Sequence, residues 1–472
     1  MGTVRVFNHY IHASVLWLAV VQASILILSV YFAIGLSSAV DFGEVASSAW
    51  EIANRVSPMA LLFAGVTLIW MAAMGLYQPH LREGISGLFR RTAGAFLFTT
   101  AAMGALFVLF PSVFVWHGVY MLAIGVAFLL VFGTHYAFFC LVDREQLKRN
   151  VLVYGSGERA EKILGSMRRA SDRRGFRFTG FVHIDGSEDR VDEKEVVRVE
   201  GALSDYIKNN AIDQVVIAAD DRRAGLPIDE LLECKLSGIE VMDAATFFER
   251  EAGKLMLDFI TPGWMVFNEG FKECNRTRVA KRCIDVLASF TLLMFTWPVM
   301  LATCIAIWIE EGFGAPVFYK QERVGLNGKT FQVMKFRSMR VDAEKAGKAQ
   351  WASKNDDRIT RVGRFIRKTR IDELPQVINV LAGDMAFIGP RPERPQFVDQ
   401  LGEEIPHYQA RHHVKPGITG WAQLCYPYGA SVHDASQKLQ FDLYYVKNHS
   451  LFLDFVIMIA TVEVVLFGKG AQ

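Results

Sequence analysis

Four long apolar stretches in the first third of the chain predict helices that lie in a membrane. They cover roughly residues 15 to 36, 59 to 77, 92 to 111 and 113 to 142. Each approaches or exceeds the ~20 residues that a helix needs to cross the hydrocarbon core of a bilayer. The composition agrees, because 51% of the residues are hydrophobic, more than a soluble globular chain normally carries. We therefore predict a four-helix transmembrane anchor over residues 1–145.

Basic residues between these stretches predict the orientation of the anchor. The connection after the first stretch is mainly acidic, whereas the next connection carries Arg82, Arg90 and Arg91. A second basic group follows the fourth stretch: Arg144, Lys148 and Arg149. Because lysine and arginine favour the cytoplasmic side of a membrane, we expect both ends of the anchor, and the chain that follows it, in the cytoplasm.

Residues 146–265 show a different pattern, in which short β-branched runs such as "DQVVIAAD" alternate with polar helical stretches. This pattern predicts a small Rossmann-like parallel α/β domain. Gly155, Gly157 and Ala160 match a glycine turn of the dinucleotide-binding type, but this signal is weak alone, and we favour the simpler interpretation that the glycines let the first helix pack closely on the sheet. No tyrosine of the chain is followed by lysine at Tyr-x-x-x-Lys spacing, so a short-chain dehydrogenase would lack its catalytic acid.

A further apolar run, at about 283–309, follows the basic residues Arg278, Lys281 and Arg282. Pro298 interrupts this run near its middle, where proline removes a hydrogen bond and kinks a helix. A fifth transmembrane helix is the simpler interpretation. A complete crossing, however, would carry the following basic region out of the cytoplasm, away from nucleotide-activated substrates. We therefore predict a re-entrant membrane helix that bends near Pro298 and returns.

The region after this helix is rich in cations that suit phosphate groups, since the planar fork of arginine makes bidentate phosphate contacts. Some of these residues could instead be solvated or bind anionic lipid head groups. Nucleic acid is a poor rival ligand because no readout motif accompanies the cluster. The cluster comprises Lys335, Arg337, Arg340, Arg358, Arg361, Arg364, Arg367, Lys368, Arg370 and Arg391.

Two adjacent carboxylates, Asp372 and Glu373, lie inside this cluster in "RIDELPQVINV". The simplest interpretation is that Asp372 caps a helix that contains Pro375 in its first turn and stops at Gly383. The same geometry also suits a nucleophile, because surrounding cations keep a carboxylate ionised and attract a phosphate group. A divalent cation would screen the repulsion between the carboxylate and an incoming diphosphate.

From about Arg278 onward the motifs "KRCIDV", "TWPVML", "QERVG", "KFRSM", "RIDELPQVINVLAGDMAFIGPRP", "KPGITGWAQ" and "DLYYVKN" closely resemble the bacterial sugar transferases called monotopic phosphoglycosyl transferases. The whole architecture resembles the large, WbaP-like polyprenyl-phosphate hexose-1-phosphate transferases. The expected fold is thus membrane α plus α/β, ending in a C-terminal α-rich catalytic domain over residues 276–472.

The resemblance implies that the protein transfers a sugar phosphate from a UDP-sugar to undecaprenyl phosphate at the cytoplasmic face of the bacterial inner membrane, with release of UMP. By similarity, Asp372 is the nucleophile, and Mg²⁺ binds the diphosphate near Asp372 and Glu373. The residues expected beside the substrate phosphates or the nucleotide are Lys335, Arg337, Arg367, Arg370, Pro390, Arg391 and Pro392.

One motif departs from the family pattern, since Trp297 precedes Pro298 where many relatives have serine. Two other functions stay open: a non-catalytic scaffold for polysaccharide assembly, and an NAD-dependent enzyme that modifies nucleotide sugars. The sequence leaves the sugar and the oligomeric state undetermined, with a homodimer as one option. The last apolar segment, with Asp454 and Glu463, is expected to lie at the membrane interface rather than to insert deeply.

Overall fold

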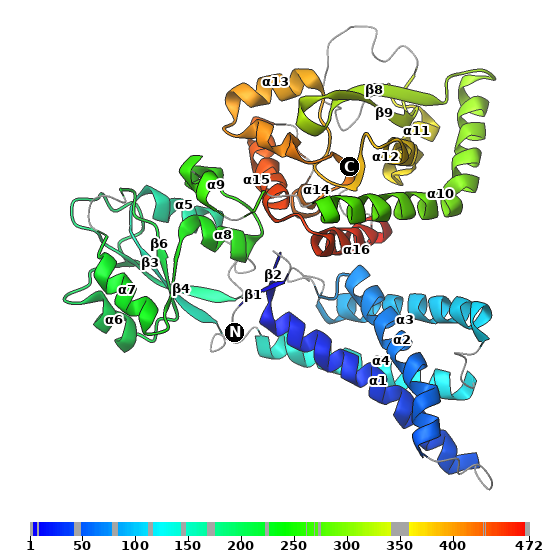
Figure 1. Ribbon diagram of the computed structural model, residues 1–472, viewed down its shortest axis with the longest axis horizontal. Coiled ribbons are helices and arrows are strands. Elements are labelled where there is room, and N and C mark those ends of the chain that lie inside the picture. Colours follow the sequence, from blue (N-terminus) through cyan, green and yellow to red (C-terminus); the bar gives the residue numbers. More distant parts are fainter. Residues whose placement is uncertain are drawn as a thin grey trace. The chain divides into compact units, whose positions relative to one another are not determined.

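The structure, a computed structural model, divides the chain into two compact units (Figure 1). One unit comprises Met1–Val6 and Tyr10–Ala252, and the other comprises Phe7–His9 and Gly253–Gln472. The residues that the structure describes are 3–6, 9–41, 49–77, 84–111, 117–142, 148–167, 175–221, 226–260, 262–268, 270–271, 275–340, 358–427, 429 and 431–467.

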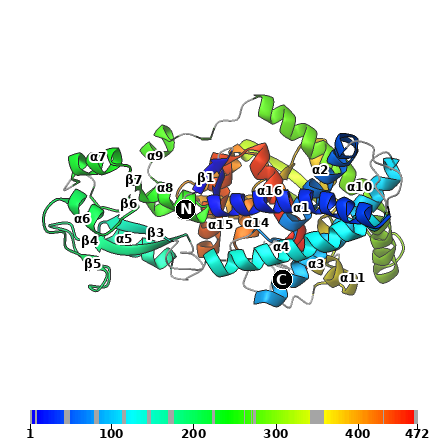
Figure 2. The same ribbon diagram turned by 90° about the horizontal axis from the view of Figure 1, so that it is seen from below.

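The first unit contains four long helices after two short paired strands, and α1 and α4 lie side by side (Figure 2). Their bounds are β1 Thr3–Val6, β2 His9–His12, α1 Ala13–Asp41, α2 Ala49–Ala73, α3 Gly84–Leu109 and α4 His117–Val142. By length and composition, α1, α3 and α4 could each cross a membrane, and the described apolar part of α2, Ser57–Ala73, is shorter. The helices thus agree with the predicted membrane association.

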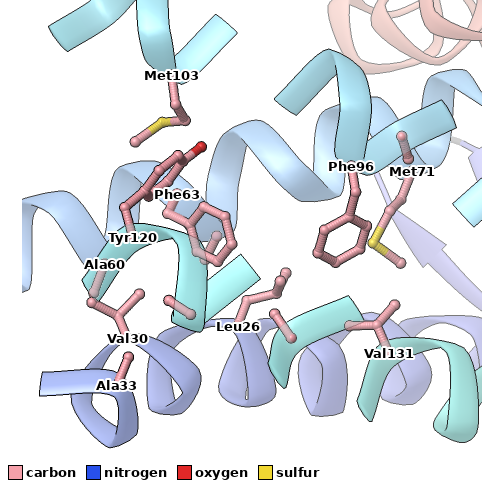
Figure 3. Packing of buried hydrophobic residues seen from close by; sticks show 14 of the residues in the cluster. Leu26, Val30, Ala33, Ala60, Phe63, Met71, Phe96, Met103, Tyr120 and Val131 are labelled. Carbon is pink, nitrogen blue, oxygen red and sulfur yellow. The ribbon is translucent and has the colours of Figure 1, made fainter. Parts of the chain in front are cut away.

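The anchor helices pack through a core of aliphatic, methionine and aromatic side chains. Leu26, Phe63, Phe96 and Val131 from the four helices are buried there (Figure 3). Each helix also exposes large apolar side chains on its outer side, for example Leu28 and Leu129. Helices that are apolar on every side are typical of membrane proteins.

A polar network closes one end of the helical anchor. Two carbonyl groups in the turn after α2 accept hydrogen bonds. His135 Nε2 lies 3.1 Å from the Leu76 oxygen, and Arg91 Nη1 lies 2.5 Å from the Met74 oxygen. Arg90 and Arg91 are therefore not in a connection, as predicted, but within α3, where Arg91 is buried. Its cationic group satisfies a helix C-terminus, where unpaired carbonyl groups favour positive charge.

The rest of the first unit is a five-stranded parallel sheet with helices, as the alternating pattern predicts. The strand order is β5-β4-β3-β6-β7, so the order reverses between β3 and β6. Strand β3 is buried along nearly its whole length, which is typical of parallel sheets covered on both faces. The elements are β3 Arg149–Tyr154, α5 Glu158–Ser166, β4 Phe176–Val182, β5 Val196–Val197, α6 Leu203–Asn209, β6 Gln214–Ile217, α7 Ile228–Leu236, β7 Glu240–Asp243 and α8 Ala244–Ala252.

The second unit is mainly helical and contains two small sheets, one antiparallel (β8 with β9) and one parallel (β10 with β11). Its longer elements are α9 Pro262–Phe267, α10 Asn275–Glu311, β8 Phe318–Val324, β9 Thr330–Phe336, α11 Arg361–Lys368, α12 Gln376–Ala382, β10 Ala386–Ile388, α13 Pro395–Glu404, β11 Gly417–Thr419, α14 Trp421–Cys425, α15 Val432–Asn448 and α16 Leu451–Phe467.

Helix α10 contains Pro298 and bends sharply along its length (Figure 1). Its two ends pack on the same unit, because Lys281 donates to the Ile388 carbonyl group at 3.1 Å and Glu310 accepts from the backbone amide of Arg361 at 2.7 Å. The side chains between these ends include many exposed apolar ones. The bend agrees with the predicted proline break, while the insertion of α10 into a membrane stays a prediction.

The second unit also includes His9, which lies shortly before α1 begins at Ala13. His9 is buried, and its Nδ1 atom lies 2.9 Å from the hydroxyl group of Tyr444. Its ring meets the Trp421 ring edge-on, with centroids 5.6 Å apart. The side chain of His9 is thus part of the core of the second unit, although nearly the whole length of the chain separates His9 from Tyr444.

Candidate active site

The acidic pair lies in a 3-10 turn, Ile371–Glu373, between α11 and α12. Arg370, which precedes the turn, has a φ of +60°, a left-handed conformation that reverses the chain after α11. The following helix α12 begins only at Gln376 and ends at Gly383, as predicted, where φ is +96°. Pro375 occupies the N-cap of α12, and no side chain caps this end. The helix-cap interpretation of Asp372 is therefore wrong.

Asp372 carries a buried oxygen atom, Oδ1, that has no hydrogen-bond partner in the part of the chain that the structure describes. A buried polar atom without a partner costs free energy, so it marks a position that folding alone does not explain. Burial, reinforced by the negative charge of Glu373, raises the pKa of Asp372 to about 6. The carboxylate is therefore ionised at neutral pH but more basic than an ordinary aspartate.

Glu373 is the anion on which the neighbouring cations converge. Its Oε1 atom lies 2.7 Å from Arg391 Nη2, 3.5 Å from Lys335 Nζ and 3.8 Å from Arg370 Nη1. Burial opposes ionisation of Glu373, but the three cations outweigh it and lower its pKa below the ordinary value. Burial also lowers the pKa of Lys335. The two carboxylates thus differ, because Glu373 is fully engaged with cations whereas Asp372 keeps a free oxygen.

Hydrogen bonds to successive carbonyl groups hold the loop that carries Arg391. Arg411 Nη2 donates to the carbonyl group of Arg391 at 2.9 Å, and Arg323 Nη1 donates to that of Pro392 at 3.1 Å. Pro390 and Pro392 have fixed φ angles and lack an amide hydrogen. The two prolines therefore stiffen the loop, and their carbonyl groups help to fix it.

Arg411 is itself held by a buried ion pair. Its Nη2 atom lies 2.7 Å from Asp442 Oδ2, and its Nη1 atom donates to the Tyr408 hydroxyl group at 2.8 Å. Both members of the ion pair are almost completely buried, where the loss of either partner would leave an uncompensated charge. Sequence reasoning assigned no role to Arg411 or Asp442. The available signal was Asp442 itself, a charged residue inside the quoted "DLYYVKN" motif.

A second buried pair supports the start of the same loop. Lys281 Nζ lies 2.6 Å from Asp454 Oδ2 and donates to the Ile388 carbonyl group at 3.1 Å. Tyr445 donates to the other oxygen of Asp454 at 2.7 Å. The charge of Asp454, which was expected to keep α16 at the membrane interface, is thus neutralised inside the unit.

Two residues predicted for this site lie outside the contacts around Glu373. The Arg337 Nε atom donates to the Pro316 carbonyl group at 2.8 Å. Arg367 lies in the last turn of α11, and among the described residues it forms no ion pair with Asp372 or Glu373. The structure therefore brings together Lys335, Arg370 and Arg391 of the predicted cations.

A magnesium ion fits this site only in part. Among the described residues, no three His, Cys, Asp or Glu side chains converge on one point. Mg²⁺, however, is commonly held by one or two carboxylates together with the phosphates of a substrate, and the free oxygen of Asp372 suits that arrangement. Glu373 suits it less, because its Oε1 atom already lies 2.7 Å from Arg391.

The glycine turn of the α/β domain was the second candidate site, and the chain itself fills it. Asp220, which follows β6, accepts hydrogen bonds from the backbone amides of Glu158 and Arg159, both over 2.9 Å. A Cβ atom on Gly157 would collide with this carboxylate. The start of α5, at the point where the strand order reverses, is where a dinucleotide phosphate binds in such folds. Here the carboxylate of Asp220 takes that place.

Comparison with known sequences finds two families that match separate parts of the chain. The family described as bacterial sugar transferase matches residues 276–468. The family described as CoA-binding domain matches residues 72–224, which include part of the helical anchor and most of the parallel sheet.

Three relatives show the extent of the similarity. A UDP-N-acetylgalactosamine-undecaprenyl-phosphate N-acetylgalactosaminephosphotransferase of Aeromonas hydrophila is 42% identical over 253 residues, 54% of this chain and 58% of the relative. A UDP-glucose:undecaprenyl-phosphate glucose-1-phosphate transferase of Xanthomonas campestris pv. campestris is 36% identical over 282 residues, 57% and 56% of the two chains. The uncharacterized sugar transferase EpsL of Bacillus subtilis is 41% identical over 194 residues, 41% of this chain and 91% of the relative. The chain thus spans a little over half the length of the first two relatives and most of the third.

Proposed function

The chain belongs to the bacterial sugar transferase family, and on this premise we propose that it transfers a hexose-1-phosphate from a UDP-sugar to undecaprenyl phosphate. Relatives with 42% and 36% identity carry names that describe this class of reaction. The reaction releases UMP, and it would be the first membrane step in the synthesis of an exopolysaccharide or O-antigen. The free oxygen of Asp372 is the observation that carries the proposal.

In the first step, the Asp372 carboxylate attacks the β-phosphorus of the UDP-sugar. A bond forms between the carboxylate oxygen and phosphorus, and the bond from this phosphorus to the bridging oxygen breaks, so UMP leaves. In the second step, a phosphate oxygen of undecaprenyl phosphate attacks the same phosphorus, which restores the free carboxylate. Each step exchanges one phosphorus–oxygen bond for another, and no oxidant or reductant is needed.

The pKa of Asp372 suits a nucleophile. With a pKa of about 6 the carboxylate is mostly ionised at neutral pH, and its raised basicity makes it more reactive towards phosphorus than an ordinary aspartate. Lys335 and Arg391 provide positive charge for the diphosphate close to it. Glu373 holds these cations in place through the ion pairs at 3.5 Å and 2.7 Å, so its role is to organise them.

Mg²⁺ belongs to the proposal as the family's expected cofactor, and the Asp372 carboxylate, through the oxygen that does not attack, would hold it together with the diphosphate. When bound, the ion would reduce the repulsion between the carboxylate and the substrate phosphates. Glu373 was the second expected ligand, but its place among three cations favours an indirect role. Arg391 and Lys335 bind the phosphates whether or not the ion is present.

The bent helix α10 supports a cytoplasmic site at the inner membrane. Both ends of α10 contact the second unit, which favours entry into and return from one face of the bilayer over a complete crossing. His9, shortly before α1, also belongs to this unit. Basic residues predict that α1 begins in the cytoplasm, so we place the catalytic unit there.

A direct assay tests the reaction. The purified full-length protein in nanodiscs, with Mg²⁺ and undecaprenyl phosphate, is incubated with UDP-glucose, UDP-galactose and their N-acetylated hexosamine counterparts. We expect UMP release with at least one donor, together with an equal amount of lipid-linked sugar phosphate. Release of UDP instead of UMP would show that the bond to the sugar breaks, and the proposed reaction would be wrong.

The two other functions receive less support from the structure. An NAD-dependent enzyme needs the start of α5 for a dinucleotide phosphate, and Asp220 occupies this position. A non-catalytic scaffold has no need of the unpaired Asp372 oxygen, whose burial costs free energy. A homodimer, expected from large relatives, stays a prediction.

A further inference from the structure

Helix α11 presents an unusual outer face, in which one phenylalanine lies among three basic side chains. Phe365 is 62% exposed, and Arg361, Arg364 and Lys368 are exposed on the same side of the helix at spacings of three and four residues. None of the three cations forms an ion pair with a residue that the structure describes. The opposite face of α11 packs into the unit through Ile366. The exposed aromatic ring and the basic groups around it are therefore available to an external partner.

The contact between α11 and the end of α10 points to a membrane as this partner. Glu310, in the last turn of α10, accepts hydrogen bonds from the backbone amides of Arg361 and Val362 over 2.7 Å and 2.9 Å. The start of α11 thus lies next to the last turn of α10. Ile305 and Ile309 on the final turns of α10 are exposed and apolar, as expected for a segment that leaves the hydrocarbon core at this point.

The loop after α10 exposes a second aromatic side chain, close to the end of this helix. Phe313 is 96% exposed, and the glycines on both sides of it, Gly312 and Gly314, have φ angles of +100° and +92° that other residues rarely adopt. Trp308 stacks on the Phe313 ring with a centroid distance of 5.7 Å. The chain therefore holds this ring outward in a fixed turn.

We propose that these residues form an interfacial face, defined as Phe313, Arg361, Arg364, Phe365 and Lys368, that binds the head-group layer of an anionic phospholipid membrane. The aromatic rings would enter the boundary between head groups and acyl chains, and the basic groups would lie against lipid phosphates. The face then fixes the level of the turn that carries Asp372, which follows α11 directly. The proposal depends on α10 lying in a membrane and not on the transfer reaction.

Charge complementarity distinguishes this partner from others. Each lysine or arginine near an anionic bilayer strengthens attachment by about fivefold, so the three basic residues together contribute about a hundredfold. Polyprenyl phosphate offers a similar phosphate group but would be present at only one or two molecules per site. A general membrane surface requires the bulk lipid to be anionic, whereas a substrate site does not.

Fluorescence quenching in nanodiscs tests the proposal with the full-length protein. In a cysteine-free background, a bimane label is placed at Phe313→Cys or Phe365→Cys, and quenching by lipids with a doxyl group near the head is compared with quenching by aqueous iodide. Glu403→Cys, an exposed position on α13, is the matched control label. Discs contain either phosphatidylcholine alone or phosphatidylcholine with phosphatidylglycerol.

We expect lipid quenching at both aromatic positions in anionic discs, and iodide quenching alone at Glu403. With the label at Phe313, the triple variant Arg361→Gln, Arg364→Gln and Lys368→Gln should lose most of the lipid quenching, whereas Glu404→Gln should not. Iodide quenching at Phe313 and Phe365 equal to that at Glu403 would overturn the proposal. Lipid quenching that appears in neutral discs only after undecaprenyl phosphate is added would also overturn it, since the face would then be a substrate site.

Discussion

The Asp220 carboxylate lies at the start of α5, and Asp372 lies in the 3-10 turn before α12. The two carboxylates differ in how their oxygens are paired. Both oxygens of Asp220 accept a backbone amide from α5, each at 2.9 Å. One oxygen of Asp372 is buried and has no partner in the described chain. The α/β domain therefore uses the Asp220 carboxylate to complete its fold, whereas the second unit leaves one oxygen of Asp372 without a hydrogen-bond partner among the described residues.

The electrostatic environments of the two carboxylates also differ. A carboxylate at a helix N-terminus is stabilised by the amides and by the helix dipole. Asp372 is instead buried beside another carboxylate, which raises its pKa to about 6. The ionised Asp372 side chain therefore lowers the free energy of unfolding of the protein. The comparison indicates that a buried carboxylate without hydrogen-bond partners is better evidence of function than a match to a sequence motif.

Replacing the proposed nucleophile, Asp372, should have the largest effect. Asp372→Asn removes the attacking oxygen anion, so we expect UMP release to fall by about 10³-fold or more and no sugar phosphate to remain bound to the protein after denaturation. The same change removes a buried charge, and at pH 7.5 it should stabilise the folded protein by up to roughly 3 kcal/mol. Turnover and thermal unfolding are measured on the same preparation.

The opposite signs of these two effects make the test of Asp372 specific. A residue needed only for folding would lose stability together with activity. If Asp372→Asn kept near-normal turnover, or if it lost turnover because the protein unfolded, the contrast with Asp220 would not hold.

Replacing the anion that organises the cations should have the next largest effect. Glu373→Gln leaves Arg391, Lys335 and Arg370 without their shared partner, and breaking a buried ion pair costs about 3 kcal/mol of stability. Because Arg391 is then no longer fixed, we expect turnover to fall by about 10²-fold. Glu403→Gln, on the surface of α13, is the matched control and should change neither quantity. A stable Glu373→Gln variant with full turnover would contradict the organising role.

The pH dependence of turnover should report the pKa of Asp372. Only the ionised carboxylate attacks, so kcat/KM should fall about tenfold per pH unit below pH 6. In Glu373→Gln the negative neighbour is gone and the cations remain, so this acid limb should move to lower pH. Because the folded-state pKa of Asp372 is raised, protonation favours the folded state below about pH 6, and this contribution is lost as the pH rises. A limb below pH 5 in the unmodified protein would contradict the assignment.

The sequence predicts well whatever depends on periodic apolar residues. The anchor helices, the parallel sheet and the stop of α12 at Gly383 all follow from local patterns, since each needs only residues that are close in the chain. The bend of α10 was predicted from Pro298 together with the argument that a complete crossing would carry the following basic region out of the cytoplasm. Lys335, Arg370 and Arg391, three of the cations expected for the site, lie around Glu373, and their contact with a substrate stays a prediction.

Contacts between distant residues could not be predicted in the same way. Arg411 and Asp442 form their pair across two intervening elements, β11 and α14, and the sequence around either residue does not identify the other. The self-filled glycine turn depends on Asp220, 62 residues after Glu158. The cap interpretation of Asp372 was wrong because the chain places a separate 3-10 turn before α12, a distinction that helix-start signals do not make.

Replacing Asp220, whose carboxylate oxygens already accept hydrogen bonds from the start of α5, should have the smallest effect on turnover. Asp220→Ala removes a cap from α5, so the α/β domain should lose about 1 kcal/mol of stability, while UMP release should change by less than about twofold. The two freed amides then become available to an anion, and calorimetric titration of the full-length variant with NAD⁺ tests whether Asp220 had excluded one. Tight binding of NAD⁺ to the unmodified protein would show that the carboxylate yields to a dinucleotide, and the glycine turn would then be a site after all. Because Asp220→Asn keeps one amide contact, it should lie between the two proteins in stability, which separates a lost cap from general damage to the domain.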